Sequence, residues 1–486
     1  MAKVIRDLPD TSSYWAAVWT ICPMPDVHVI CDAPIGCFNL VATAVPDYTD
    51  AIPHIENITP SVIREEEVGG SGTGPAVQRT YEDLRDEGLL EGKHLIVVST
   101  AESEMIGSDL SDLVTQLQPG TTFFHSESLS DDEWVGRDRV LAWLWDNYGS
   151  PAEVEPGLVN IIGPTYGCFN SPSDLEEVRR LIEGAGGTVN MVFPFEATLS
   201  DIGQLARGQV NVVLYKEFGH TLADKLGQPW LHAPMGIQET VAFVKELGDR
   251  LGTADQARAF IRREKETTLQ AVWDLWRGPQ GDWFGTTTVG IVSTGTYADG
   301  LKRYLGEELG LPVTFSVSRP RRPGEMNNSE IRQMLHTQAP TFVFGSINEK
   351  IYLSEAGARR TTFIPAAFPG PVVLRSVGTP FMGFRGTVHI IQMIVNSLYE
   401  ALFNFLPVDS AYQQNSMGGQ GQPGNIPWDP EAKHILDQAL EKLPFLARIS
   451  ASRELQMRVE MRAHIRKLDH VSRELAEEVL QRELNS

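Results

Sequence analysis

The four-residue sequence Gly-Cys-Phe-Asn occurs twice, at residues 36–39 and 167–170, each time after a predicted strand. In open α/β sheets, ligands gather at the carboxyl ends of the strands. A glycine there lets the backbone approach a ligand closely, and the thiolate of a neighbouring cysteine can bind a metal. Cys37 and Cys168 are therefore candidate metal ligands. The alternative is two similar strand-loop-helix units with cysteines that only pack, and composition alone favours that alternative.

The composition excludes several functional classes. With 486 residues the chain is expected to hold about three domains. A net charge of −22 argues against nucleic-acid binding, which needs clustered Lys and Arg, and against an anionic membrane surface. No apolar run reaches the roughly 20 residues of a membrane span, and residues 1–25 lack the apolar core of a secretory signal. We therefore expect a cytoplasmic location, where cysteines more often bind metals or act in catalysis than form disulfides.

Short apolar runs alternate with helical patterns along the chain. Most of these runs lack polar alternation, which is typical of strands buried on both faces of a parallel sheet. Ser173, followed three residues later by Glu176, predicts a capping box at the start of one helix. The predicted strands are residues 27–31, 94–99, 158–162, 188–193, 210–215, 289–293, 313–317, 341–344 and 362–364.

The pattern predicts an α/β chain of three doubly wound, mostly parallel-sheet domains with a helical C-terminal extension. The Gly- and Gln-rich stretch before that extension is typical of a flexible linker. In the extension, Met457, Met461 and Ile465 recur at helical spacing among basic residues, which predicts an amphipathic helix that docks on a surface. The predicted boundaries are 1–155, 156–285 and 286–412 for the domains, 413–427 for the linker and 428–486 for the extension.

Other familiar catalytic patterns are absent. The glycine-rich run 69–74 is not followed by the Lys-Ser/Thr of a P-loop, so it is either a helix start near an anionic ligand or a plain turn. The sequence has no G-x-S-x-G and no H-E-x-x-H. Residues 295–297 are a weak candidate for a ligand loop. His220 and His232 follow predicted strands, although structural roles are favoured for both.

Three segments of the first predicted domain resemble the nitrogenase-like superfamily. Residues 32–37 (Asp-Ala-Pro-Ile-Gly-Cys) resemble the loop whose cysteine holds an iron–sulfur cluster. Residues 64–70 resemble the acidic stretch and double glycine beside that cluster, and residues 98–110 resemble a strand end and helix start of the family. The resemblance implies that Cys37 is a cluster ligand.

The sequence also departs from that family. Nitrogenase subunits carry a further cluster cysteine where this chain has Ala101, and the family's first cluster cysteine would fall near Tyr14. Only Cys37 matches, whereas a cubane cluster needs about four ligands, so a partner subunit is the expected source of the others. The remaining cysteines are interpreted as off the pattern or as packing residues: Cys22, Cys31 and Cys168.

Within the superfamily the sequence is most similar to the Z subunits of chlorophyllide a oxidoreductases. This resemblance implies a catalytic subunit of an ATP-dependent reductase that reduces the C7=C8 double bond in ring B of a chlorophyllide, in bacteriochlorophyll biosynthesis. It further implies a homologous Y-type subunit in a heterotetramer, a [4Fe-4S] cluster shared with that partner, and a separate ATP-driven component carrying a second iron–sulfur cluster. The resembling segments are residues 14–18, 48–53, 216–219, 233–237 and 446–451.

Two other functions stay open. One is the B-type component of light-independent protochlorophyllide reductase, which resembles this chain but has Asp at the place of Cys37. The other is a non-catalytic scaffold on which a metallocluster is assembled. The resemblance places the counterpart of a known proton donor within residues 276–282 but does not single out a residue, so the sequence names no proton donor.

Overall fold

The computed structural model describes residues 11–39, 41, 55–70, 72–277, 287–358, 361–368, 378–405, 426–441, 455–456 and 458–484. Contacts divide the chain into two units, Met1–Ile391 and Gln392–Ser486. Within the described ranges, no helix has the length and apolarity needed to cross a membrane.

The first unit contains three four-stranded sheets, and every paired strand in them is parallel. The first sheet has the order β2 (Ile58–Pro60), β1 (Val27–Asp32), β3 (His94–Ser99), β4 (Thr122–Phe124). The second has the order β6 (Thr188–Phe193), β5 (Leu158–Ile162), β7 (Val210–Val213), β8 (Trp230–His232). The third has the order β10 (Val313–Arg319), β9 (Val289–Thr294), β11 (Phe342–Gly345), β12 (Thr362–Pro365). The predicted three-sheet α/β fold is therefore confirmed, with one topology repeated three times.

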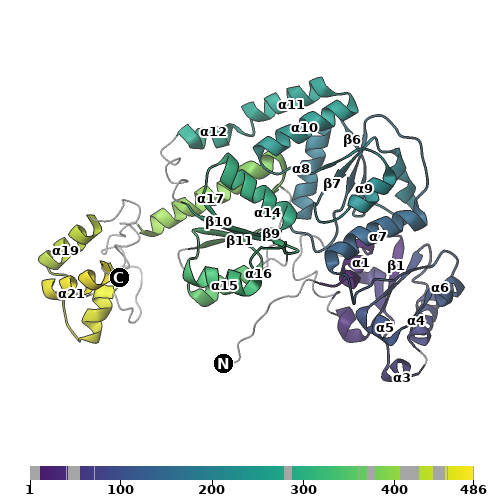
Figure 1. Cartoon of the computed structure of the whole chain (residues 1–486), viewed down its shortest axis with the longest axis horizontal. Coiled ribbons are helices and arrows are strands. Elements are labelled where there is room, and N and C mark those ends of the chain that lie inside the picture. The colour runs from purple at the N-terminus through teal and green to yellow at the C-terminus, as the bar shows by residue number, and fades with distance from the viewer. Residues whose placement is uncertain are drawn as a thin grey trace. The chain divides into compact units, whose positions relative to one another are not determined.

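Helices connect the strands and pack around the sheets, as a parallel sheet requires (Figure 1). Around the first sheet these are α1 (Ser13–Ile21), α3 (Glu65–Val68), α4 (Gly74–Asp86), α5 (Ala101–Ile106), α6 (Ser111–Leu117) and α7 (Glu133–Tyr148). With the second sheet come α8 (Ser171–Gly184), α9 (His220–Leu226), α10 (Ile237–Leu251), α11 (Ala254–Glu266) and α12 (Gln270–Arg277). With the third come α14 (Gly295–Leu301), α15 (Asn328–Thr337) and α16 (Ile347–Ala356), and α17 (Gly383–Phe405) begins in the first unit and ends in the second.

The central strands are apolar because both of their faces are covered. Every residue of β1, β7 and β9 is buried, including the polar His28 and Asp32 of β1. The helices α4 and α6 cover one part of the first sheet through a shared apolar cluster that includes Ile30, Val77 and Val114. Burial on both faces removes the polar alternation of a half-exposed strand, as the sequence pattern predicted.

A buried arginine joins the first and second sheets. Arg137 of α7 is fully buried and donates a hydrogen bond to the backbone oxygen of Tyr166, 2.8 Å away. Its guanidinium lies over the rings of Trp19, Trp134 and Phe218 at 5.6 to 5.7 Å from their centroids. A desolvated cation over aromatic faces is stabilising, so this contact helps to fix the two sheets against each other.

The predicted capping box at Ser173 is wrong. The helix α8 begins two residues earlier, at Ser171, and its N-cap is Asn170, whose side chain makes no cap hydrogen bond. Pro172 explains the shift, because proline is favoured in the first turn of a helix, where its missing N–H is not needed.

The second unit has its own small core. Two helices, α19 (Pro430–Glu441) and α21 (Arg473–Leu484), pack with a helical stretch at residues 458–465. The buried residues of this core are Ala432, Leu436, Ala439, Leu455, Val459, Ala463, Val471, Leu475, Ala476 and Leu480. The buried face therefore includes Leu455, Val459 and Ala463, whereas the predicted stripe residues Met461 and Ile465 are 48% and 67% exposed. Met457 and residues 413–425 lie outside the described residues, and the predicted domain boundaries stay predictions.

Candidate metal centre

Cys37 lies at the carboxyl edge of the first sheet. It sits in a short helical turn, residues 35–39, that follows β1, and its side chain is partly exposed. Its Sγ donates a hydrogen bond to Oε1 of Glu102 over 3.0 Å. Glu102 belongs to the first turn of α5, directly after β3. Because β1 and β3 are neighbours in the sheet, the ends of both strands bring these two side chains together.

Two of the three segments that resemble the superfamily meet at this edge, and residues on either side of the third bond to the same Asp32 carboxylate. Thr100, at the end of β3, donates its hydroxyl to the backbone oxygen of Asp32 over 2.8 Å. The buried carboxylate of Asp32 accepts hydrogen bonds from the hydroxyls of Ser61 (3.1 Å) and Thr73 (2.6 Å), and burial raises its pKa. Thr73 is the residue before α4. The acidic group beside the start of this helix is therefore the Asp32 side chain, which belongs to the chain itself. Asp32 therefore bonds where an anionic ligand at this helix start would be expected.

The environment of Cys37 favours the neutral thiol. Burial raises its pKa to about 11, with a further contribution from Glu102, which accepts a hydrogen bond from the thiol and adds negative charge. Metal ligation needs the thiolate, so binding a metal here would release this proton. The thiol is therefore held in place by its hydrogen bond to Glu102, and the raised pKa favours its protonated form.

Tyr14 contributes an unusual polar group close to this site. The residue lies on α1 and is only 3% exposed, and its hydroxyl is buried without a hydrogen-bond partner. The thiol of Cys31 is its main polar neighbour, and Cys37 and Glu102 lie within electrostatic range. Burial, reinforced by these neighbours, raises the pKa of Tyr14 well above its ordinary value, so the phenol stays protonated.

These residues fit one corner of a metal cluster and not a complete site. Among the described residues, no group of three or more His, Cys, Asp or Glu side chains could hold a metal ion. Ala101, at the start of α5, offers no ligand atom. The single thiol at this partly exposed edge could provide one ligand of a metal cluster.

The two Gly-Cys-Phe-Asn copies adopt different structures. No atom lies within 4 Å of a Cβ added at Gly36, so that position is open. Gly167 has a φ of +75° and packs so closely on Trp19 that a Cβ would lie 2.6 Å from its ring. Cys168 is buried, with its Sγ 3.3 Å from Oγ1 of Thr165. The second copy is therefore a packing element between the first two sheets.

Two weaker sequence candidates also have structural partners. The backbone N–H and the hydroxyl of Thr296 both bond to the carboxylate of Glu217, at 2.5 and 2.6 Å, which ties the third sheet's first helix to the second sheet. His220 and His232 form a three-ring cluster with Trp230, with centroids 5.1 to 5.6 Å apart. Burial lowers the pKa of His232 to about 4, so its ring is neutral at physiological pH.

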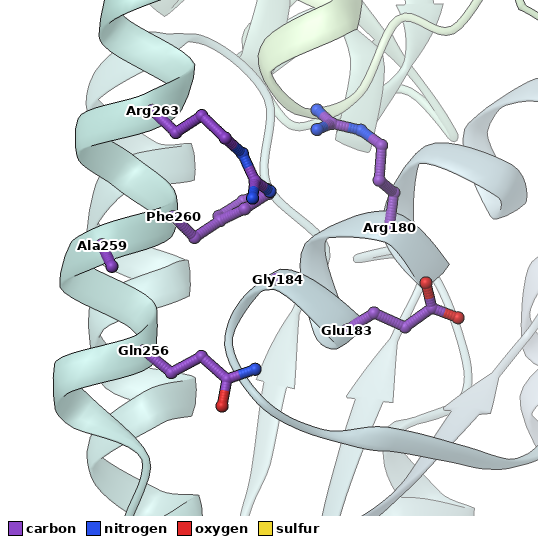
Figure 2. A pocket seen from close by; sticks show the side chains of 7 residues that line it. All are labelled: Arg180, Glu183, Gly184, Gln256, Ala259, Phe260 and Arg263. Carbon is purple, nitrogen blue, oxygen red and sulfur yellow. The ribbon is translucent and has the colours of Figure 1, made fainter.

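A hollow of about 360 Å³ lies between α8 and α11 (Figure 2). Both helices belong to the second sheet, whereas Cys37 belongs to the first. The guanidiniums of Arg180 and Arg263 lie over the ring of Phe260, 5.4 and 5.2 Å from its centroid. Arg180 also bonds to the carboxylates of Glu177 and Glu264 at 2.7 to 3.0 Å. These contacts hold the two helices together, and we assign the hollow no part in the candidate metal centre.

The sequence analysis proposed Cys37 as a ligand, which stays a prediction, and it did not anticipate that Glu102 and Tyr14 lie near this residue. Glu102 lies within a segment that resembles the superfamily, but only its distance from Cys37 in space reveals the contact. Tyr14 stood out only as a position without the expected cysteine. Its buried, unpartnered hydroxyl is a property of the tertiary structure.

Comparison with known proteins gives a consistent relationship. A family model described as nitrogenase component 1 type oxidoreductase matches residues 12–399. The B-type component of the light-independent protochlorophyllide reductase from Synechococcus sp. (strain JA-2-3B'a(2-13)) is 25% identical over 413 residues, covering 76% of this chain and 79% of the relative. Its counterpart from Heliobacterium modesticaldum is 23% identical over 490 residues, covering 89% and 90%.

A solved structure, nitrogenase Cp1 at pH 6.5, superposes with a TM-score of 0.64 at 16% sequence identity and covers 81% of this chain and 93% of that one. This likeness concerns the fold. Because the family model spans most of the chain, including all three sheets, the chain belongs to the nitrogenase component 1 type oxidoreductase family.

Proposed function

We propose that this oxidoreductase is the Z-type catalytic subunit of an ATP-dependent reductase that reduces the C7=C8 double bond of a chlorophyllide. The observation that carries the proposal is Cys37, a single thiol at the carboxyl edge of the first sheet with no second ligand at Ala101. Cys37 would hold one corner of a [4Fe-4S] cluster, and a Y-type subunit would supply the other ligands. The cluster would supply low-potential electrons one at a time.

An apolar surface at the same edge supports docking of that partner. Exposed large apolar side chains follow the carboxyl end of each strand of the first sheet, and Met105 and Ile35 are 75% and 51% exposed. Clusters of exposed apolar side chains around a polar site are typical of protein interfaces. The residues are Ile35, Val62, Val68, Met105 and Leu129. A separate ATP-driven iron–sulfur component as electron donor, and a cytoplasmic location, belong to the same proposal.

The B-type component of light-independent protochlorophyllide reductase is the second candidate, and the similarity to such proteins favours it. The cysteine at position 37 argues for the Z-type assignment, since the B-type sequence pattern has Asp there. The deciding experiment supplies the complex with chlorophyllide or protochlorophyllide under anaerobic reducing conditions and follows product absorbance. Turnover of protochlorophyllide alone would establish the second candidate. Failure to bind either pigment in a titration would instead support a cluster-assembly scaffold.

The first prediction concerns iron in the isolated chain. Because the described residues offer one partly exposed thiol and no set of three ligands, the chain purified alone is expected to carry little or no iron. Co-expression with the Y-type partner should give stoichiometric iron and labile sulfide in the complex, measured by colorimetric assay under anaerobic conditions. A stable four-iron cluster on the isolated chain would contradict the shared-cluster proposal.

The second prediction concerns the exposed apolar residues of the C-terminal unit. Met461 and Ile465 lie outside its core, so replacing both with Gln should leave the unit folded. If they cover the pigment, losing their burial should weaken chlorophyllide binding by about tenfold. Truncation after Gln422 should act in the same direction while leaving iron content and the partner complex intact.

Pigment titration and size-exclusion chromatography of the complex measure these two properties. Lys433→Gln, an exposed change on α19 of the same unit, is the matched control. Unchanged pigment affinity in the double variant, or a complex that dissociates on truncation, would show that the unit stabilises the assembly and does not cover the pigment.

A further inference from the structure

We propose that the hydroxyl of Tyr14 donates a hydrogen bond to a sulfur atom of the cluster held by Cys37, and so acts as a positioning residue that sets its reduction potential. This inference rests on the proposed function, because it requires a cluster at Cys37. It assigns a role to a residue that carries no ligand atom of the usual kind.

The observation behind this inference is a buried hydrogen-bond donor without a well-placed acceptor. Tyr14 is 3% exposed, and its hydroxyl has no hydrogen-bond partner although it is buried. Buried polar groups are nearly always hydrogen-bonded, because leaving one unpaired costs free energy. The hydroxyl therefore calls for a stronger acceptor than the chain itself supplies.

The rest of the residue is already held in place. The backbone N–H of Tyr14 donates to Oγ of Ser128 over 2.8 Å, and its ring packs within the core. A phenylalanine would satisfy both requirements, so neither explains the hydroxyl. The thiol of Cys31 is its main polar partner, although this contact falls short of hydrogen-bond geometry and a thiol is only a weak acceptor.

The surroundings point to an acceptor on the side of Cys37. The hydroxyl lies within electrostatic range of both the Cys37 thiol and the Glu102 carboxyl, which are themselves bonded to each other. Sulfide and thiolate sulfurs of a cluster are negatively charged and accept hydrogen bonds from neighbouring protein donors. Because the phenol stays protonated in this setting, it remains a donor throughout the working pH range.

The chemical consequence is a shift of potential. A donor to a cluster sulfur stabilises the reduced, more negative state more than the oxidised state, and so raises the reduction potential. Removing the hydroxyl while keeping the ring should therefore make the cluster harder to reduce and leave its ligands in place.

The test is Tyr14→Phe in the complex with its partner subunits. Tyr215→Phe is the matched control, because Tyr215 is also buried with an unpartnered hydroxyl but lies beside Cys168. Both variants should retain full iron and sulfide. A redox titration followed by EPR should show a more negative midpoint potential for Tyr14→Phe and an unchanged one for Tyr215→Phe.

Thermal unfolding of the chain without partners gives an independent readout. Losing an unpaired hydroxyl should leave the Tm of Tyr14→Phe unchanged or higher, whereas a clear drop would mean that the hydroxyl has a structural partner and would overturn the inference. An unchanged midpoint potential, or loss of iron in Tyr14→Phe, would also overturn it, the latter by making the phenol a ligand. A wild-type complex without a cluster would instead refute the proposed function.

Discussion

Cys37→Ala is expected to remove the cluster from the complex and abolish reductase activity. Cys37 is the one cysteine of the chain that is partly exposed, and its thiol lies at the edge where the apolar side chains Ile35 and Met105 are exposed. Without its sulfur this chain would offer the cluster no ligand of its own. Iron content, the cluster EPR signal and chlorophyllide turnover of the purified complex measure the effect.

Cys168→Ala tests whether the two Gly-Cys-Phe-Asn copies are equivalent. Cys168 is buried, and burial raises the pKa of its thiol, so it is a poor candidate for a ligand. We expect this variant to retain its cluster and its EPR signal, with only a modest loss of stability from the smaller side chain. An altered cluster signal in Cys168→Ala would show that the second copy also takes part.

Cys37→Ser refines the first result. A serine oxygen is able to ligate iron, so this variant is expected to keep part of the cluster with a shifted potential and not to lose it entirely. A complex of Cys37→Ala that retained full iron and turnover would refute the assignment of Cys37 as a ligand.

The parallel sheets could be predicted because burial on both faces leaves a simple mark on the sequence. Each predicted strand forms, with ends that differ by at most two residues. The strands that were missed, β2, β4 and β8, have three residues each and lie at sheet edges. Such short edge strands are only partly buried, so their sequences contain no apolar run. Their position depends on pairing with the neighbouring strand.

The candidate metal centre was predictable only as far as one residue. Cys37 could be singled out because a loop sequence resembles that of a family, whereas its hydrogen bond to Glu102 joins positions 65 residues apart. Cys168 was interpreted from the sequence as a packing residue despite the repeat, and the four identical residues do fold differently beside Trp19 and Arg137 than at an open edge. Local sequence sets which conformations are accessible, and packing against distant residues selects among them.

The largest expected effect on stability concerns Asp174, which joins the second and third sheets. Its fully buried carboxylate accepts hydrogen bonds from the hydroxyl of Tyr297 (2.5 Å) and from the backbone N–H groups of Phe381 (2.6 Å) and Met382 (2.9 Å). Asp174→Ala would remove this acceptor from the two backbone N–H groups and would leave the Tyr297 hydroxyl only the backbone oxygen of Phe169, which is expected to lower the free energy of unfolding by about 3–5 kcal/mol.

Chemical denaturation of the chain measures this loss. Asp255→Ala is the matched control, because Asp255 is an exposed acid on α11 whose pairing with Arg258 at the surface should contribute little. A loss in Asp174→Ala no larger than in the control would show that the link between the two sheets does not depend on this carboxylate.

The titration of the Asp174 carboxyl group is expected to make the stability of the chain depend on pH. Burial is the main cause that raises the pKa of Asp174 to about 6, against about 3.9 for an unfolded aspartate. The stability that its protonated form contributes is therefore fully present below about pH 4 and is lost as the pH rises through about 6, by about 3 kcal/mol in total. The asparagine side chain in Asp174→Asn cannot titrate. The free energy of unfolding of this variant should therefore increase relative to that of the wild type as the pH rises from 4 to 7. A constant difference between the two across this range would show that Asp174 does not titrate there.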